Sequence, residues 1–335
     1  MKKIIHTLFL LPLFIFSQDV DVADDATITI ETGATMTVDG SITTNTSGSI
    51  IIETSTTESG SLLAIEAGES QGKGITLRRY LDGGEEWTLI GVPVTGETVA
   101  DVDDNLRTNN GKSAIGYFDP SSNDGEFVYY DTDAATELVN GRGYSVSPSD
   151  SGTIDFTGPM PSDDVQYTLE DEGGTYGNWN LIGNPFPSYL NMTDDADQDN
   201  NFLTVNDDSF NDNYWGVYAW DGAQYVVYNH LTDDINYIAP GEGFFVYSVE
   251  GGATLAFEES MQTSGQGNNF NAEIALGAES ENIRKEVVFI ELKDRFTEKT
   301  DITKLYFTDD NEVSKGLVRG YDAGKFSSGL ESTIY

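Results

Sequence analysis

Short runs of alternating apolar and polar residues fill residues 18–80. The runs are rich in Thr, Ile and Val, and Gly33, Gly48 and Gly60 separate them at spacings of 12 to 15 residues. Alternation over such short runs is typical of β-strands with one buried face. The pattern favours the coils of a short β-solenoid or a stacked β-meander, with Ile, Val and Leu pointing inward and Thr outward. A stack this short needs a cap from the segments that follow it.

A longer pattern then occurs twice. The segment WTLIGVP from Trp87 matches WNLIGNP from Trp179, with Trp, Leu, Ile, Gly and Pro at identical spacing. Three further pairs follow in the same order: IGYFD (115–119) with VYAWD (217–221), GRGYSV (141–146) with GEGFFV (241–246), and GTIDFTGPM (152–160) with ATLAFEESM (253–261). The offsets of 92, 102, 100 and 101 residues indicate a duplicated module. We expect β-sandwich-like copies over residues 81–172 and 173–265.

Each copy contains a strand that ends in a corner of glycine and proline. Trp87 and Leu89 lie on one face of this strand in the first copy, and Trp179 and Leu181 lie on the equivalent face in the second copy. We expect this face to be buried in both copies. The residues that follow end the ladder, because proline has no amide hydrogen to donate. Since the corner occurs in both copies, we interpret it as part of the architecture and not as a functional loop.

The two ends of the chain differ from the repeated part. Residues 1–17 predict a secretory signal peptide, because two lysines precede an apolar run from Leu8 to Phe16, too short to span a bilayer, and the small Ser17 follows. We therefore expect an exported chain, extracellular or on the outer cell surface, without membrane insertion. Strand-like runs resume over residues 266–335 and stop in mid-pattern, which favours a partial third β-domain and a chain that is a fragment.

The predicted fold class is therefore all-β. It comprises a short N-terminal β-solenoid-like stack, duplicated β-sandwich-like modules and the start of a further β-domain. The 35 glycines and the 11% aromatic residues are typical of strands linked by tight turns. Cysteine is absent, so the chain has no disulfide and no thiolate metal site.

The charge of the chain restricts its partners. The formal net charge is -40, and removal of Lys2 and Lys3 with the signal peptide leaves 15 basic against 57 acidic residues, or 15 - 57 = -42. No Lys or Arg lies between Arg142 and Arg284. A field of this sign disfavours nucleic acid and anionic lipid as partners. A saline habitat is one explanation of the charge, and binding of divalent cations is another.

Four motifs together resemble a known group of proteins. They are W-x-L-I-G-N-P-F-P-S, the GEGFFV block, the threonine-rich ETGATMTVDGSI and the late RGYDAGKF. The chain resembles the large multidomain surface proteins of Bacteroidetes that the type IX secretion system exports. The resemblance implies export across the outer membrane, followed by release or attachment at the cell surface. It also implies contact with the secretion machinery through a C-terminal sorting domain, which we do not find in these residues.

Catalytic motifs are weak. The segment GESQG (68–72) fits the G-x-S-x-G nucleophile elbow, but it lies between β-strands and not at a strand-to-helix turn. The base of a triad would have to be His230, which is the one histidine after the signal peptide. A pair of carboxylates suitable for glycoside hydrolysis is expected by chance among 57 acids. We therefore expect no catalytic residues and no enzyme activity.

One acidic loop is a candidate calcium site, and no other cofactor is expected. Asp195, Asp197 and Asp199 alternate as in the first half of a D-x-D-x-D calcium loop. The sixth position is Asn200 where such loops have Gly, and the twelfth is Asn206 where they have a bidentate Glu. A solvated acidic loop is the alternative interpretation.

An aromatic strand is a candidate sugar site. Tyr218 and Trp220 point to one face of this strand and Trp215 to the other. Exposed aromatic rings can stack on sugars. Trp220 aligns with Phe118 of the first copy, as expected of a core position, so burial in the core is the alternative.

Two classes of function follow from these patterns. The first is a non-catalytic exported cell-surface protein, structural or adhesive, that presents acidic loops on repeated β-modules. The second is an accessory region, carbohydrate-binding or a spacer, of a larger secreted polysaccharide-degrading enzyme. Beyond the secretion machinery, the expected partner is an extracellular polysaccharide or another surface.

Overall fold

The computed structural model describes most of the chain up to residue 270. It covers residues 19–45, 49–65, 74–83, 87–121, 125–161, 163–174, 176–222, 224–230, 235–265, 267 and 269–270, and the backbone of residues 286–293 and 300–307. The predicted signal peptide over residues 1–17 lies outside these residues. The described part is nearly all β, which confirms the predicted class. Its helices are short, and none of those described is long and apolar enough to cross a membrane. They are α1 (Val99–Val102), α2 (Phe202–Val205), η1 (Asp103–Asn105), η2 (Asp207–Ser209) and η3 (Glu259–Met261).

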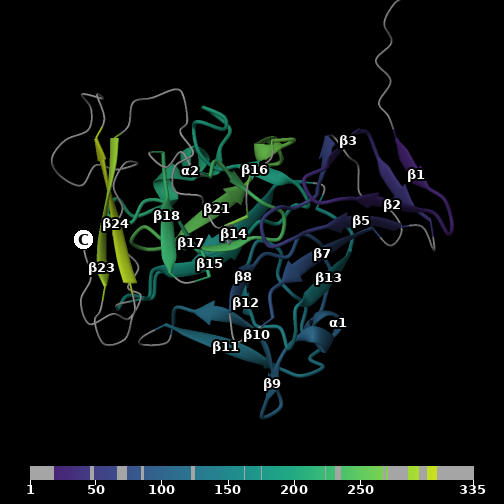
Figure 1. Ribbon diagram of the computed structural model, residues 1–335, viewed down its shortest axis with the longest axis horizontal. Coiled ribbons are helices and arrows are strands. Elements are labelled where there is room, and N and C mark those ends of the chain that lie inside the picture. The colour runs from purple at the N-terminus through teal and green to yellow at the C-terminus, as the bar shows by residue number, and fades with distance from the viewer. Residues whose placement is uncertain are drawn as a thin grey trace, which may run out of the picture.

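The N-terminal strands stack in parallel and form a short β-solenoid (Figure 1). Ile28 lies opposite Ile50, which lies opposite Ile75, so one coil takes 22 and the next 25 residues. Each coil therefore contains about two of the glycine spacings seen in the sequence. The parallel pairs are β1 (Val20–Val22) with β4 (Ile42–Thr44), β2 (Thr27–Ile30) with β5 (Ser49–Glu53) and β5 with β7 (Ile75–Leu81), and β3 (Thr35–Asp39) with β6 (Ser61–Ile65).

The solenoid is capped by both of the copies that follow it. β13 (Gly152–Gly158), in the first copy, pairs antiparallel with β7 along its whole length. The proline corner of the second copy lies against β6, on another wall of the stack, where Leu62 N donates to Pro187 O at 2.8 Å. The whole corner from Gly183 to Ser188 is buried. The free strand edges of β7 and β6, at the C-terminal end of the stack, are thereby satisfied by backbone groups from far along the chain.

The two copies have the same strand order. The first sheet is β11 (Glu126–Asp131), β10 (Lys112–Asp119), β12 (Tyr144–Val146) and β8 (Thr88–Ile90), with β9 (Thr108–Asn109) beside β10. The second sheet is β18 (Tyr225–Tyr228), β17 (Val217–Trp220), β20 (Gly243–Tyr247) and β15 (Trp179–Gly183). Within these sheets β8, β10 and β12 match β15, β17 and β20, as the sequence repeat assigns them, and β11 takes the place of β18.

A separate ladder begins and ends each copy. β14 (Val165–Leu169) pairs with β21 (Ala253–Phe257) as β7 pairs with β13. If each copy is taken to start at the first strand of its ladder, the first copy begins at β7, which the sequence assigned to the solenoid. The second copy then begins at β14, which the sequence assigned to the first copy. The remaining strands are the sheet of β16 (Tyr189–Asn191), β19 (Tyr237–Ile238) and β22 (Gln262–Thr263), and the hairpin of β23 (Glu286–Lys293) and β24 (Thr300–Phe307).

Three hydrophobic clusters stabilise this arrangement. One fills the solenoid and the first copy together, and a second fills the second copy. The third is an aromatic layer to which the sheets of both copies contribute. Within it the rings of Phe118 and Phe245 meet edge to face with centroids 5.1 Å apart, and those of Trp179 and Tyr218 do so at 4.6 Å. Edge-to-face contacts of this kind add to the free energy gained by burying the rings.

Equivalent backbone groups of the two copies meet at what we call the inter-copy joint. Gly91 N donates to Gly241 O at 3.0 Å, and the equivalent Gly183 N donates to Gly141 O at 3.1 Å. The contact is therefore related by an approximate two-fold axis. A Cβ atom on Gly183 would lie 2.4 Å from the Cα of Gly91, a distance that no side chain tolerates. This close approach explains why the W-x-L-I-G and G-x-G blocks occur in both copies.

Replacement of Gly183 by alanine tests the joint. We expect Gly183→Ala to lower the free energy of unfolding by about 3 kcal/mol, because the new methyl group has to force two backbones apart. Gly152→Ala is the matched control, since nothing lies within 4 Å of a Cβ at that site. Its effect should stay within about 0.5 kcal/mol. Chemical denaturation measures both, and equal stabilities of the two variants would contradict the close contact.

Candidate functional site

The most unusual polar group in the described core is a buried ion pair. Arg79, on β7, and Glu242, in the G-E-G turn before β20, are 2% and 1% exposed. Arg79 Nη2 lies 2.8 Å from Glu242 Oε1. Burial raises the pKa of the Glu242 carboxyl, and the Arg79 guanidinium acts in the opposite direction. Nε and Nη1 of Arg79 have no hydrogen-bond partner among the described residues, so the pair itself is needed to keep the guanidinium stable in the core.

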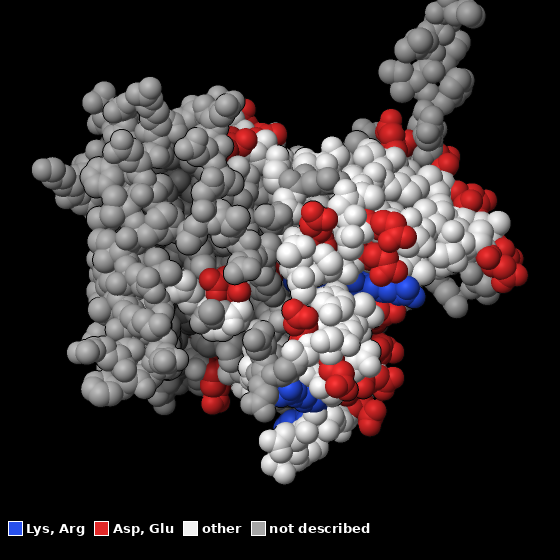
Figure 2. Space-filling model, viewed as in Figure 1, with Lys and Arg blue, Asp and Glu red and all other residues white. Residues whose placement is uncertain are grey.

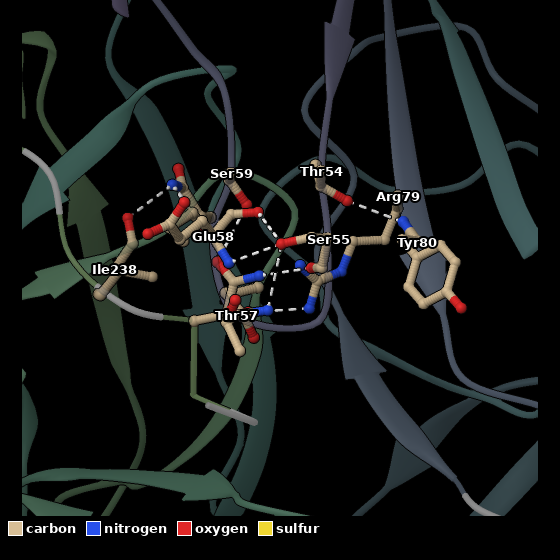
Figure 3. Close-up of polar contacts among 12 residues, drawn as sticks. Thr54, Ser55, Thr57, Glu58, Ser59, Arg79, Tyr80 and Ile238 are labelled. Atoms are coloured by element: carbon tan, nitrogen blue, oxygen red, sulfur yellow. Dashed lines mark hydrogen bonds and ion pairs between the residues drawn. The ribbon is translucent and has the colours of Figure 1, made fainter. Parts of the chain in front are cut away.

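Polar contacts around this pair tie the solenoid to the second copy. Figure 3 shows the turn from Thr54 to Ser59 beside Arg79, with the Ser55 hydroxyl accepting from the backbone of Thr57 and Glu58. The same turn is held from outside the solenoid. Its contacts include Ser59 N to Tyr189 Oη at 3.3 Å, Ser59 Oγ to Asn269 Oδ1 at 3.0 Å and Asn269 Nδ2 to Ser55 O at 2.9 Å. These side chains are committed to structural partners.

The calcium interpretation of the acidic loop is not supported. Asp195, Asp197 and Asp199 lie in a turn where Asp197 Oδ1 accepts from the backbone N of Asp199 at 3.0 Å and of Asn200 at 2.9 Å. These two bonds lower the pKa of Asp197. Among the described residues no three His, Asp or Glu side chains converge as metal ligands. Asp197 therefore shapes the turn before α2.

The structure places the His230 ring against Asp194. Its Nδ1 lies 2.8 Å from Asp194 Oδ1, and hydrogen bonding to His230 lowers the pKa of Asp194. The imidazole also lies against the ring of Trp215, with centroids 4.9 Å apart. The GESQG segment (68–72), which would supply the nucleophile of a triad, lies outside the described residues.

The predicted sugar-stacking residues are core residues. Trp215 is 1% exposed and donates from Nε1 to Asp207 Oδ1 at 2.9 Å, and Tyr218 is fully buried. Trp220 is half-buried in the aromatic layer, with Phe118 in the same cluster. The alignment of Trp220 with Phe118 had indicated this core role. Neither Trp215 nor Tyr218 offers a face to a ligand, so the structure favours the alternative, burial in the core, for these two residues.

An exposed tryptophan lies elsewhere. Trp87 is 39% exposed, whereas its equivalent Trp179 is 3% exposed, so the expected burial of Trp87 was wrong. Trp179 is covered by Tyr214 and Tyr247, at centroid distances of 5.7 and 5.0 Å. The repeat offsets of 102 and 100 place a lysine and a serine at those positions in the first copy. Among the described residues Trp87 lies beside the ring of Tyr129, with centroids 5.2 Å apart.

A pocket of about 320 Å³ opens between the two copies. Arg142, from the G-R-G turn of the first copy, donates from Nε to the Tyr167 hydroxyl of the second copy at 3.2 Å. Its guanidinium also lies over the Tyr117 ring, 5.0 Å from the centroid. No sequence pattern marked this place, because its residues come from four separated segments. The lining residues are Tyr117, Phe118, Asp119, Pro120, Ser121, Arg142, Tyr167, Glu170, Glu172, Asn180 and Leu181.

Comparison with known proteins gives a family. The model of a domain of unknown function, DUF8693, matches residues 13–335. The chain belongs to the DUF8693 family. No curated protein and no solved structure matches it. The family description states no activity, so the function of this DUF8693 chain has to be argued from its geometry.

One buried carboxyl of this DUF8693 chain has a strongly altered pKa. Glu97 is 5% exposed, and its Oε2 accepts from Thr157 N at 3.1 Å, which links the segment before α1 to β13. Burial raises its pKa from 4.5 to about 7, and the nearby negative charges of Asp101 and Asp155 act in the same direction. The folded chain therefore binds this proton more tightly than the unfolded chain does.

A double-mutant cycle tests the buried pair. Arg79→Met or Glu242→Gln alone should lower the free energy of unfolding by about 3–5 kcal/mol, because each leaves one charged or polar group unpaired in the core. The double variant should cost much less than the sum. Arg78→Met is the control, since Arg78 is paired with Glu53 and Asp155 at the surface. If Arg79→Met costs no more than Arg78→Met, the pair does not hold the joint together.

The pH dependence of stability tests Glu97. Its raised pKa contributes stability that is present below about pH 4.5 and is lost as the pH rises through about 7. Between these values wild type should lose on the order of 2 kcal/mol relative to Glu97→Gln, which has no proton to release. Denaturation of both proteins across this pH range gives the difference. Parallel curves for wild type and Glu97→Gln would show that the carboxyl titrates normally.

Proposed function

We propose that this DUF8693 chain is a non-catalytic, exported cell-surface protein with a structural and adhesive role. One observation carries the proposal. The buried charged and polar side chains around Arg79 and Glu242 tie the solenoid, the first copy and the second copy to one another. Buried side chains that bond to one another stabilise the fold and cannot reach a substrate.

The surface of the described part fits the same role. Figure 2 shows Asp and Glu spread over the visible face, with Lys and Arg in few places. Exposed carboxylates of one sign keep a surface solvated and prevent the chains from associating without specificity. The proposal includes export by the type IX route and a position outside the cell, which the predicted signal peptide and the resemblance to Bacteroidetes surface proteins support.

A second candidate function is an accessory carbohydrate-binding region of a larger secreted polysaccharide-degrading enzyme. The exposed ring of Trp87, with Tyr129 beside it, favours this alternative. An exposed indole ring offers an apolar face on which a sugar ring can stack. The site lies on the first copy alone, since the equivalent Trp179 is buried.

Display of the full chain on a non-adherent bacterium tests both functions. Under the first proposal, displaying cells are retained under flow on bare and polysaccharide-coated surfaces, and Trp87→Ala leaves retention unchanged. Under the alternative, cells are retained on polysaccharide only, and Trp87→Ala abolishes retention while Val139→Ala, at the other exposed large apolar residue described, does not. Retention equal to that of cells without the chain would contradict both. Release of reducing sugar ends by the purified chain would contradict a non-catalytic role.

A further inference from the structure

Equivalent strand positions in the two copies carry different residues at the inter-copy joint. Arg79 lies opposite Ile154 in the pairing of β7 with β13. Tyr167 lies opposite Leu255 in the pairing of β14 with β21. Ile154 and Leu255 occupy the same place in the duplicated block, at an offset of 101 residues. Arg79 and Tyr167 are therefore equivalent residues.

The partners of these two residues are also equivalent. Glu242 and Arg142 are the middle residues of the two G-x-G turns. On one side of the approximate two-fold axis, Arg79 and Glu242 form the buried pair, which closes that position completely. On the other side, Arg142 meets the Tyr167 hydroxyl, and the contact borders the 320 Å³ pocket. The Arg79–Glu242 contact is thus buried, whereas the equivalent Tyr167–Arg142 contact borders an open pocket.

The open version holds charges of both signs that do not pair with each other. Asp119, Glu170 and Glu172 line the pocket together with Arg142. Among the described residues Arg142 forms no ion pair, and its guanidinium is held by Tyr117 and Tyr167. A molecule in the pocket therefore meets guanidinium donors and carboxylate acceptors at the same time.

We propose that this pocket binds a sugar unit that carries no negative charge. Sugar hydroxyls both donate and accept hydrogen bonds, so neighbouring hydroxyls can link the Arg142 donors to the carboxylate acceptors. Hydrogen bonds to charged groups are the stronger ones, which favours this arrangement over neutral contacts. The pocket volume of about 320 Å³ lies at the small end of the range for ligand pockets and suits one sugar unit.

The surrounding charge sets the sign of the ligand. One arginine against three carboxylates gives the pocket lining a charge of 1 - 3 = -2, and the whole chain carries -40. This field opposes a uronic acid, a sulfated sugar or a phosphate. A neutral sugar experiences no such repulsion, and an amino sugar is attracted. The inference does not depend on the surface role proposed above, since a scaffold without adhesive function could still hold a sugar here.

Saturation-transfer NMR on the full chain tests the proposal. The probes are neutral hexoses and pentoses, glucosamine, glucuronic acid and glycine, each added separately. We expect saturable transfer to one or more neutral sugars or to glucosamine, with a dissociation constant of about 1 mM or lower. Glucuronic acid and glycine should give no saturable signal.

Paired variants locate the binding. Glu170 and Glu172 are exposed, so Glu170→Gln with Glu172→Gln should fold normally, and we expect sugar binding to weaken about tenfold or more. Glu126→Gln with Glu137→Gln is the matched control, because it removes the same charge from exposed residues outside the pocket. Its dissociation constant should equal that of wild type.

Three results would overturn the proposal. The first is that no sugar of the panel binds. The second is that glucuronic acid or glycine binds in preference, which would mean an anion or amino-acid site. The third is that the control pair weakens sugar binding as much as the pocket pair, which would place the sugar elsewhere. Failure here would leave the surface-retention result intact, so the two proposals can be judged separately.

Discussion

The architecture depends on one close backbone contact, in which Gly91 and Gly183 meet across an approximate two-fold axis. Because neither residue has room for a side chain, the two copies approach until their backbone amides and carbonyls bond directly. That approach brings the G-E-G turn onto β7 of the solenoid, where Glu242 meets Arg79. It also places the proline corner of the second copy against β6. The proline corner that covers the β6 edge of the solenoid is thus positioned by a contact between two segments that both lie outside the solenoid.

Duplication gave the joint two equivalent halves, and the halves have taken different roles. The half with Arg79 and Glu242 is dry and closed, and its charges stabilise the structure only because they are paired. The half with Arg142 and Tyr167 is open and keeps its charges accessible. A structural contact and a candidate binding pocket can therefore derive from the same ancestral contact. The difference lies in the residue type at two equivalent positions.

Short-range patterns allowed much of the fold to be predicted, and long-range contacts account for the rest. Alternation and turn residues predicted the strands, and the matched blocks predicted two copies with the same strand order. The coil length could not be predicted, because each coil contains two turns of similar composition. The pairing of β7 with β13 and of β14 with β21 had no signal in the sequence, since β7 and β14 share no sequence match.

The candidate sites show the same difference between what local sequence patterns predict and what long-range contacts decide. Trp87 and Trp179 look alike in sequence, and the difference in their exposure comes from Tyr214 and Tyr247, which only the second copy has. Comparison of all aligned positions, and not only of the matching ones, would have revealed it. The pairing of Arg79 with Glu242, 163 residues apart, left no local signal, although a glutamate and an arginine at the same place in two G-x-G turns did mark that place as different between the copies.

Amide hydrogen exchange at peptide resolution, over a series of denaturant concentrations, tests most directly whether the joint makes one cooperative unit of the three parts. We then expect the same free energy of opening for peptides from β5 in the solenoid, β10 in the first copy and β17 in the second. The reason is that each of these parts is stabilised by its contacts with the others. Opening of β5 at a lower free energy, with β10 and β17 still protected, would show that the solenoid is independent and would contradict the central role of the joint.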